Sequence, residues 1–238
     1  GTAITQNGSQ DYFVVYDPIP VQVKITSPVA NEPILPSVDA LSRVKIGWEA
    51  YGFPTGTVTI EFSDDNGANW SAIATGIDIN SIVYNWFVPN VSTTEALIRI
   101  TKEGTGETTT SGLFTIMPEP TVTVASTQCE GYFTINWTAV AGATGYEVMM
   151  AKDGEMEVVA STSASTFTYT LSGLSKDSVY WATVRPVMNG KPGRRGVAMT
   201  RQPNNGTCAG SISDNDLKID SIIAPVSGRR FTSTQPGA

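Results

Sequence analysis

The stretch Val44-Lys45-Ile46-Gly47-Trp48 recurs 89 positions later as Phe133-Thr134-Ile135-Asn136-Trp137. In both copies apolar side chains alternate with polar ones and the run ends in Trp. This pattern is typical of a half-buried strand that delivers one large aromatic side chain to a core. A second alternating strand follows each copy, at residues 57–62 and 145–150. The sequence therefore predicts one β-module that is repeated with divergence.

The length of 238 residues accommodates two β-sandwiches of about 100 residues each. Thr, Ser, Val, Ile and Gly are abundant, and no run of residues reads as an amphipathic helix. We therefore predict an all-β fold of tandem sandwiches. Proline-rich breaks divide the chain into a linker or last strand of an upstream domain at 1–20, modules at 21–118 and 119–208, and a tail at 209–238.

Charge and composition exclude several classes of function. The net charge is −7, without the basic stripe that a phosphate backbone requires, so we expect no nucleic-acid partner. No apolar run is long enough to span a bilayer, so we expect no membrane insertion. The absence of histidine removes Ser-His-Asp and Cys-His catalysis, and we expect no enzymatic activity. Because the chain starts at Gly1 without a signal peptide, we expect it to be an excerpt of a larger protein.

Cys129 and Cys208 bracket the second module, just before its Trp strand and just after its last strand. A disulfide between them would close a loop of roughly 80 residues and stabilise the module by about 4 kcal/mol. The other interpretation is two unrelated buried thiols. The bracketing position favours the disulfide, and with it an oxidising, extracellular location, either secreted or at the cell surface.

In the second module, Trp137 is followed by strands at 145–150 and 168–171, then by Leu174, and six residues later by Tyr180 at the head of a Tyr-x-x-x-Val-Arg pattern. This combination resembles fibronectin type III. The resemblance implies that Trp137 packs under the core, that Leu174 plugs one end, and that Tyr180 forms a corner hydrogen bond. The bracketing cysteine pair departs from the family pattern.

The first module, with Trp48 and Trp86 as core residues, more loosely resembles immunoglobulin-like modules appended to secreted bacterial enzymes. The tail strand at 217–223 looks like the first strand of a third sandwich. Together these parts resemble regions downstream of the catalytic domain in large secreted bacterial proteins, such as subtilisin-like peptidases exported by the type IX system. The resemblance implies a non-catalytic accessory module, whether spacer, adhesion unit or binding unit, whose partners include other domains of the same polypeptide.

Residues 63–70 match the Asp-box pattern of a tight hairpin, defined here by Ser63, Asp65, Gly67 and Trp70. In such a hairpin the Asp accepts hydrogen bonds from backbone amides, and Gly supplies a positive φ. We expect no cofactor or metal. The alternative is a calcium ion near Asp64 and Asp65.

Two stretches of the second module are candidate binding sites. Alternation places Trp181, Thr183 and Arg185 on the outer face of one strand, where Trp181 could stack on a sugar or dock a protein. The competing interpretation is that Arg185 and Met149 cover the indole ring. The alternative function is therefore a carbohydrate-binding module that uses Trp181.

The second stretch is the basic segment 189–195, with the cations Lys191, Arg194 and Arg195. Its Gly and Pro content predicts a loop between the last two strands. Three cations there could bind an acidic polysaccharide or a carboxylate-rich cell-surface protein. The competing interpretation is a mobile, solvated loop without a ligand.

Overall fold

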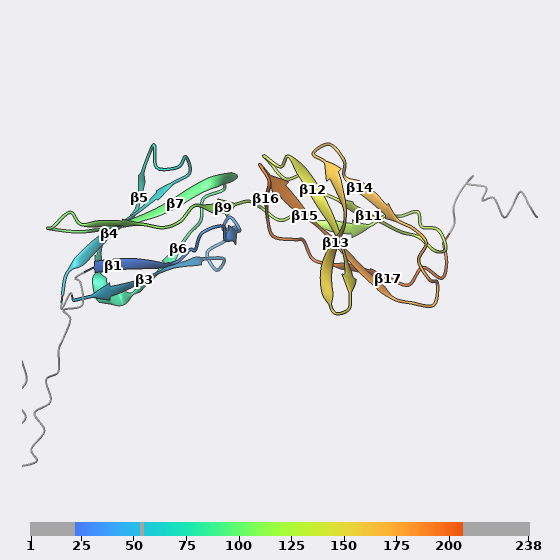
Figure 1. Ribbon diagram of the computed structural model, residues 1–238, viewed down its shortest axis with the longest axis horizontal. Coiled ribbons are helices and arrows are strands. Elements are labelled where there is room, and N and C mark those ends of the chain that lie inside the picture. The colour runs from blue at the N-terminus through green and yellow to red at the C-terminus, as the bar shows by residue number, and fades with distance from the viewer. Residues whose placement is uncertain (1–21, 53–54, 207–238) are drawn as a thin grey trace, which may run out of the picture.

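The computed structural model describes residues 22–52 and 55–206, and these form two β-sandwiches joined end to end (Figure 1). Their only helical element is a 3-10 turn, η1 (Ile79–Ser81). The predicted all-β tandem-sandwich fold is confirmed. Among these residues no helix is long and apolar enough to cross a membrane. The predictions for 1–20 and 209–238 lie outside the described residues.

The first sandwich consists of two facing sheets. One sheet has the order β1 (Gln22–Ser27), β3 (Val44–Tyr51) and β6 (Val83–Trp86). The other has the order β2 (Pro33–Ile34), β9 (Phe114–Ile116), β7 (Thr93–Lys102), β4 (Thr57–Ser63) and β5 (Ser71–Asp78), with β8 (Thr108–Thr110) also paired to β7. All pairs are antiparallel except β2 with β9.

Buried aromatic side chains pack among isoleucines and valines in the core of this sandwich. Trp48 is 2% exposed, and its indole Nε1–H donates a hydrogen bond to the carbonyl of Ile79 over 2.8 Å. Trp86 packs between Phe62 and Phe114, with ring centroids 5.1 and 6.4 Å away. The alternation seen in the sequence thus corresponds to one buried face per strand.

The second sandwich has three strands facing a larger sheet. The small sheet is β10 (Val122–Val124), β11 (Phe133–Trp137) and β14 (Thr168–Leu171). The large sheet is β13 (Glu155–Ser163), β12 (Gly145–Lys152), β15 (Tyr180–Met188), β16 (Lys191–Pro192) and β17 (Met199–Arg201). β16 and β17 both pair with β15, so the last strand runs in two pieces. This strand order agrees with the resemblance to fibronectin type III.

A bulge interrupts the ladder between β12 and the edge strand β13. Val148 pairs with Ala160 and Met149 with Val158, which leaves Val159 as an extra residue in β13. The inserted residue bends and twists the edge strand locally.

Two tyrosine hydroxyls tie loops to the second core. The hydroxyl oxygen of Tyr180 accepts a hydrogen bond from the backbone N–H of Ser175 over 3.0 Å, and Leu174 packs against the core nearby. The hydroxyl oxygen of the buried Tyr146 accepts one from the N–H of Val140 over 2.8 Å. Trp137 lies beside Tyr146, with ring centroids 5.7 Å apart.

The two sandwiches share Met117. Its backbone N–H donates a hydrogen bond to the carbonyl of Ile34 in the first sandwich over 3.1 Å. Its side chain is 1% exposed and belongs to the hydrophobic core of the second sandwich. Since β9 ends at Ile116 and β10 begins at Val122, the connection between the sandwiches consists of residues 117–121.

Candidate functional site

The basic segment predicted as one loop at 189–195 is divided between a turn, a strand and an anchored stretch. Val187 pairs with Pro192 and Met188 with Lys191, so only residues 189–190 form the turn. Asn189 and Gly190 have φ angles of 48° and 79°, which suits a two-residue hairpin turn. The prediction of a long loop is therefore wrong, because the Asn-Gly pair is by itself a sufficient turn.

Residues 193–198, which follow β16, are fixed by two glycines. The N–H of Gly193 donates to the carbonyl of Pro186 over 2.8 Å, and that of Gly196 to the carbonyl of Val184 over 2.9 Å. A Cβ atom on Gly196 would overlap the carbonyl oxygen of Pro120, so only glycine fits this close backbone approach. The segment is thereby held against both β15 and the start of β10.

This segment also corrects the prediction for Thr183, whose side chain was expected to face solvent. Thr183 is fully buried, and its hydroxyl donates a hydrogen bond to the carbonyl of Gly196 over 2.6 Å. Met149 on β12 is buried as well. Alternation along β15 is intact, but the crossing segment covers part of the outer face.

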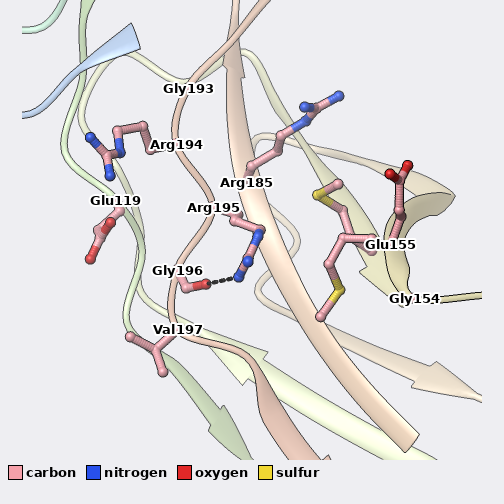
Figure 2. A pocket seen from close by; sticks show the side chains of 11 residues that line it. Glu119, Gly154, Glu155, Arg185, Gly193, Arg194, Arg195, Gly196 and Val197 are labelled. Carbon is pink, nitrogen blue, oxygen red and sulfur yellow. Dashed lines mark hydrogen bonds between the residues drawn. The ribbon is translucent and has the colours of Figure 1, made fainter. Parts of the chain in front are cut away.

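An open groove of about 780 Å³ lies between this segment, β15 and the β12–β13 hairpin. We call it the basic groove; its lining includes Glu119, Met149, Glu155, Met156, Arg185, Arg194 and Arg195. In Figure 2, Arg194 and Glu119 lie on one side of the segment, while Arg195 extends on the other side, where Glu155 also lies.

The three arginines of the basic groove differ in their contacts. The Nε–H of Arg185 donates to Oε2 of Glu147, its cross-strand neighbour on β12, over 2.6 Å. Arg194 and Arg195 are exposed and form no ion pair with any described residue. Arg195 donates only a long 3.5 Å bond to the carbonyl of Gly196. Two guanidinium groups are therefore available to a ligand.

The structure brings together three of the five predicted binding residues, namely Arg185, Arg194 and Arg195. Lys191 instead lies at the junction, where its Nζ donates a hydrogen bond to Oδ1 of Asn31 over 3.1 Å. Trp181 does not line the groove; it is 47% exposed on β15, opposite Thr200 of β17.

The Asp-box residues form a compact hairpin between β4 and β5. Oδ1 of Asp65 accepts hydrogen bonds from the hydroxyl of Ser63 over 2.7 Å and from the N–H of Asn69 over 2.9 Å. The side-chain amide of Asn69, which donates to Oδ2 over 2.7 Å, and these two contacts lower the pKa of Asp65 to about 2. Gly67 has a φ of 87° and accepts a hydrogen bond from the indole of Trp70 over 2.9 Å.

The hairpin therefore uses its own donors to satisfy the Asp65 carboxylate. Asp64 contributes a backbone carbonyl that accepts a hydrogen bond from the Thr93 hydroxyl over 2.8 Å. Within the described ranges no cluster of three or more Asp, Glu, Cys or His side chains is placed to hold a metal ion. Trp70 packs under Arg99, whose guanidinium carbon lies 4.1 Å from the ring centroid.

Sequence reasoning missed Glu119, Glu155 and Met156 as lining residues. Glu119 lies between β9 and β10, and Glu155 and Met156 begin β13, so both segments are distant in sequence from the arginines. The one available signal was the Gly-x-x-Gly spacing of Gly193 and Gly196 around the two arginines. Paired glycines indicate two places where the backbone approaches its neighbours closely.

A scan against models of protein families and a search of curated proteins found no match. Among solved structures, the chain is similar to a segment of two fibronectin type III domains from chicken tenascin, with 15% identity, 77% of this chain and 98% of that chain covered, and a TM-score of 0.44. It is also similar to the structure of FN3tt mut, with 23% identity, 36% of this chain and 93% of that chain covered, and a TM-score of 0.32. A third similar structure is that of the FN1–FN3 domains of chicken CNTN1, with 15% identity, 73% of this chain and 68% of that chain covered, and a TM-score of 0.32. The β-sandwich fold itself follows from the strand order of this chain.

Proposed function

We propose that the chain is a non-catalytic accessory module of a larger secreted or cell-surface bacterial protein, such as a peptidase, in which it acts as a spacer. The observation that supports this proposal is the sharing of Met117 between the two sandwiches. A side chain buried in one core and a backbone bonded to the other sheet leave few free dihedral angles between the modules. A spacer with such a joint keeps a fixed separation between its neighbours.

Small-angle X-ray scattering of the chain tests the spacer role. A narrow interatomic distance distribution, unchanged between low and high salt, is expected for a stiff pair of sandwiches. A broad distribution like that of two freely linked domains contradicts the proposal. Hydrolysis of casein or of polysaccharides by the purified chain would contradict the non-catalytic part.

The proposed extracellular location rests on the cysteine pair. Arg201 donates hydrogen bonds to the carbonyl of Cys129 over 3.3 Å and to that of Asn205. Gly206 packs directly on the backbone of Gln128 and Cys129. Cys208 lies outside the described residues, but it follows Gly206 by only two positions, within reach of a disulfide to Cys129.

A thiol assay on the denatured, unreduced protein tests this pairing. We expect no reactive thiol before reduction and two after it, with a lower melting temperature of the second sandwich once the bond is reduced. Two thiols in the unreduced protein would contradict both the disulfide and the argument for an oxidising compartment.

A second candidate function is carbohydrate binding at Trp181. The supporting observation is that almost half of this large aromatic side chain is exposed, although it sits on a regular strand. The substitution Trp181→Ala should abolish retention on an immobilised polysaccharide without changing the melting temperature. If a glycan array shows no binding by the unsubstituted chain, this candidate is rejected.

A further inference from the structure

We propose that the basic groove binds an extended acidic segment of another polypeptide, with carboxylates on Arg194 and Arg195 at the two sides of the segment 193–198 and an apolar side chain against Met156. This proposal adds a ligand to the accessory module and does not depend on its role as a spacer.

The first argument is that these two arginines have no structural task. Elsewhere in the described chain, the guanidinium of Arg99 pairs with Glu61 over 2.9 Å and that of Arg201 bonds the carbonyl of Tyr132 over 3.0 Å. Arg185 likewise forms an ion pair with Glu147. Arg194 and Arg195 form no ion pair with a described residue, and their side chains extend on the two sides of the segment 193–198 (Figure 2).

The second argument is that their backbone is fixed in advance. Gly193 and Gly196 lock both ends of the Arg194-Arg195 pair through hydrogen bonds to β15 and close contacts with Met117 and Pro120. A ligand therefore meets arginines whose main chain is already ordered, which lowers the entropic cost of binding. Planar guanidinium groups match carboxylates in geometry as well as in charge.

The third argument concerns the class of ligand. The groove has two methionines in its lining, and thioether side chains adapt to apolar groups of varied shape. It has no aromatic lining residue on which a sugar ring could stack. Glu119 and Glu155 also line it, and their charges oppose a polymer that carries a negative charge on every unit more than a peptide that carries one on every second residue. An acidic peptide with apolar side chains fits these features better than an acidic polysaccharide does.

The test is fluorescence anisotropy with two short labelled peptides of equal charge, one alternating Glu and Leu and the other alternating Glu and Ser. We expect the Glu-Leu peptide to bind more tightly, and binding to weaken as salt is added. The double variant Arg194→Gln, Arg195→Gln should weaken binding about tenfold or more, since each charged hydrogen bond contributes strongly. Both residues are exposed, so the variant should keep the melting temperature.

The matched control is Lys24→Gln, Lys176→Gln, which removes two exposed positive charges outside the groove lining. It should leave the affinity for the Glu-Leu peptide within about twofold, because remote exposed charges are screened. Equal losses in the two double variants, or no binding of either peptide, would overturn the proposal. Tighter binding of polygalacturonate than of the Glu-Leu peptide would assign the groove to a polysaccharide and overturn it as well. None of these results changes the scattering test of the spacer.

Discussion

Lys191 and Asn31 are 160 residues apart in the chain, yet the Nζ of Lys191 donates a hydrogen bond to Oδ1 of Asn31 over 3.1 Å. This bond joins the first residue of β16 to the turn before β2, and so it crosses between the sandwiches. Met117, in the connection between the sandwiches, is buried. The junction thus has an apolar centre and a polar rim, which is the organisation of a small protein interface.

Replacing Met117 should both destabilise the second sandwich and loosen the junction. Met117→Ala removes a side chain that is almost fully buried, so we expect a loss of about 2–5 kcal/mol in the free energy of unfolding. Urea denaturation measures that loss, and small-angle scattering should show a broader distance distribution. Met156→Ala, at a partly exposed site, is the control and should cost much less. Equal costs for the two variants would contradict the shared role of Met117.

Asp65 should make the stability of the first sandwich sensitive to acid. Hydrogen bonds from Asn69 and Ser63 lower its pKa from 3.8 to about 2 in the folded state. The stabilisation is therefore fully present above about pH 4 and is lost as the pH falls toward 2, when the folded carboxylate takes up a proton.

The measurement compares urea unfolding of the unsubstituted protein with that of Asp65→Asn. The unsubstituted protein should be the more stable at pH 7, and the difference should disappear near pH 2. Asp64→Asn is the neighbouring control, because Asp64 serves the hairpin through its backbone carbonyl. If the difference in the free energy of unfolding between the unsubstituted protein and Asp65→Asn stays constant with pH, the charge of Asp65 does not contribute to stability.

Gly196 should tolerate no side chain. In Gly196→Ala the new methyl group would overlap the carbonyl oxygen of Pro120, so the segment must move away from β10. We expect a loss of about 1–3 kcal/mol, which calorimetry of the second sandwich would detect. Val197→Ala, next to it in an exposed position, should be close to neutral. An unchanged melting temperature in Gly196→Ala would mean that the segment is not held as described.

The two tyrosine hydroxyls should differ in their contributions to stability. Tyr146→Phe leaves the N–H of Val140 without a partner in a buried place, and we expect a cost of about 1–3 kcal/mol. Tyr180→Phe frees the N–H of Ser175 at an exposed site, where water replaces the lost oxygen, so its cost should be smaller. Chemical denaturation of both variants gives the comparison. A larger loss of stability in Tyr180→Phe than in Tyr146→Phe would contradict this prediction.

The fold could be predicted because its signals are local. Alternation with period two ending at Trp48 and Trp137 defines strands, their inner faces and two modules without knowledge of their pairing. Thr183 shows the limit of this reasoning. Alternation places Thr183 on the outer face of β15, as the sequence predicts, but residues 193–198 cover it there. No local pattern shows which strand a later segment will cross.

The basic groove was only partly predictable for the same reason. Arg194 and Arg195 are visible as a charged pair in the sequence, and Trp181 was the more conspicuous candidate. The other lining residues, Glu119, Met149, Glu155 and Met156, come from the connection before β10 and from the β12–β13 hairpin, and no local pattern connects either segment with the arginines. Tyr146 also went unnoticed as a hydrogen-bond acceptor, since its partner Val140 lies in an irregular loop without a recognisable motif.

The extra residue Val159 in β13 affects how readily this edge strand can pair with a strand of a neighbouring molecule. β13 is the outermost strand of its sheet, with backbone groups that another chain could pair with. The bulge breaks the regular spacing of those groups, and the exposed Glu155 and Glu157 repel an identical strand approaching in parallel register. Many copies held close together on one surface should therefore remain separate sheets instead of merging into a continuous one.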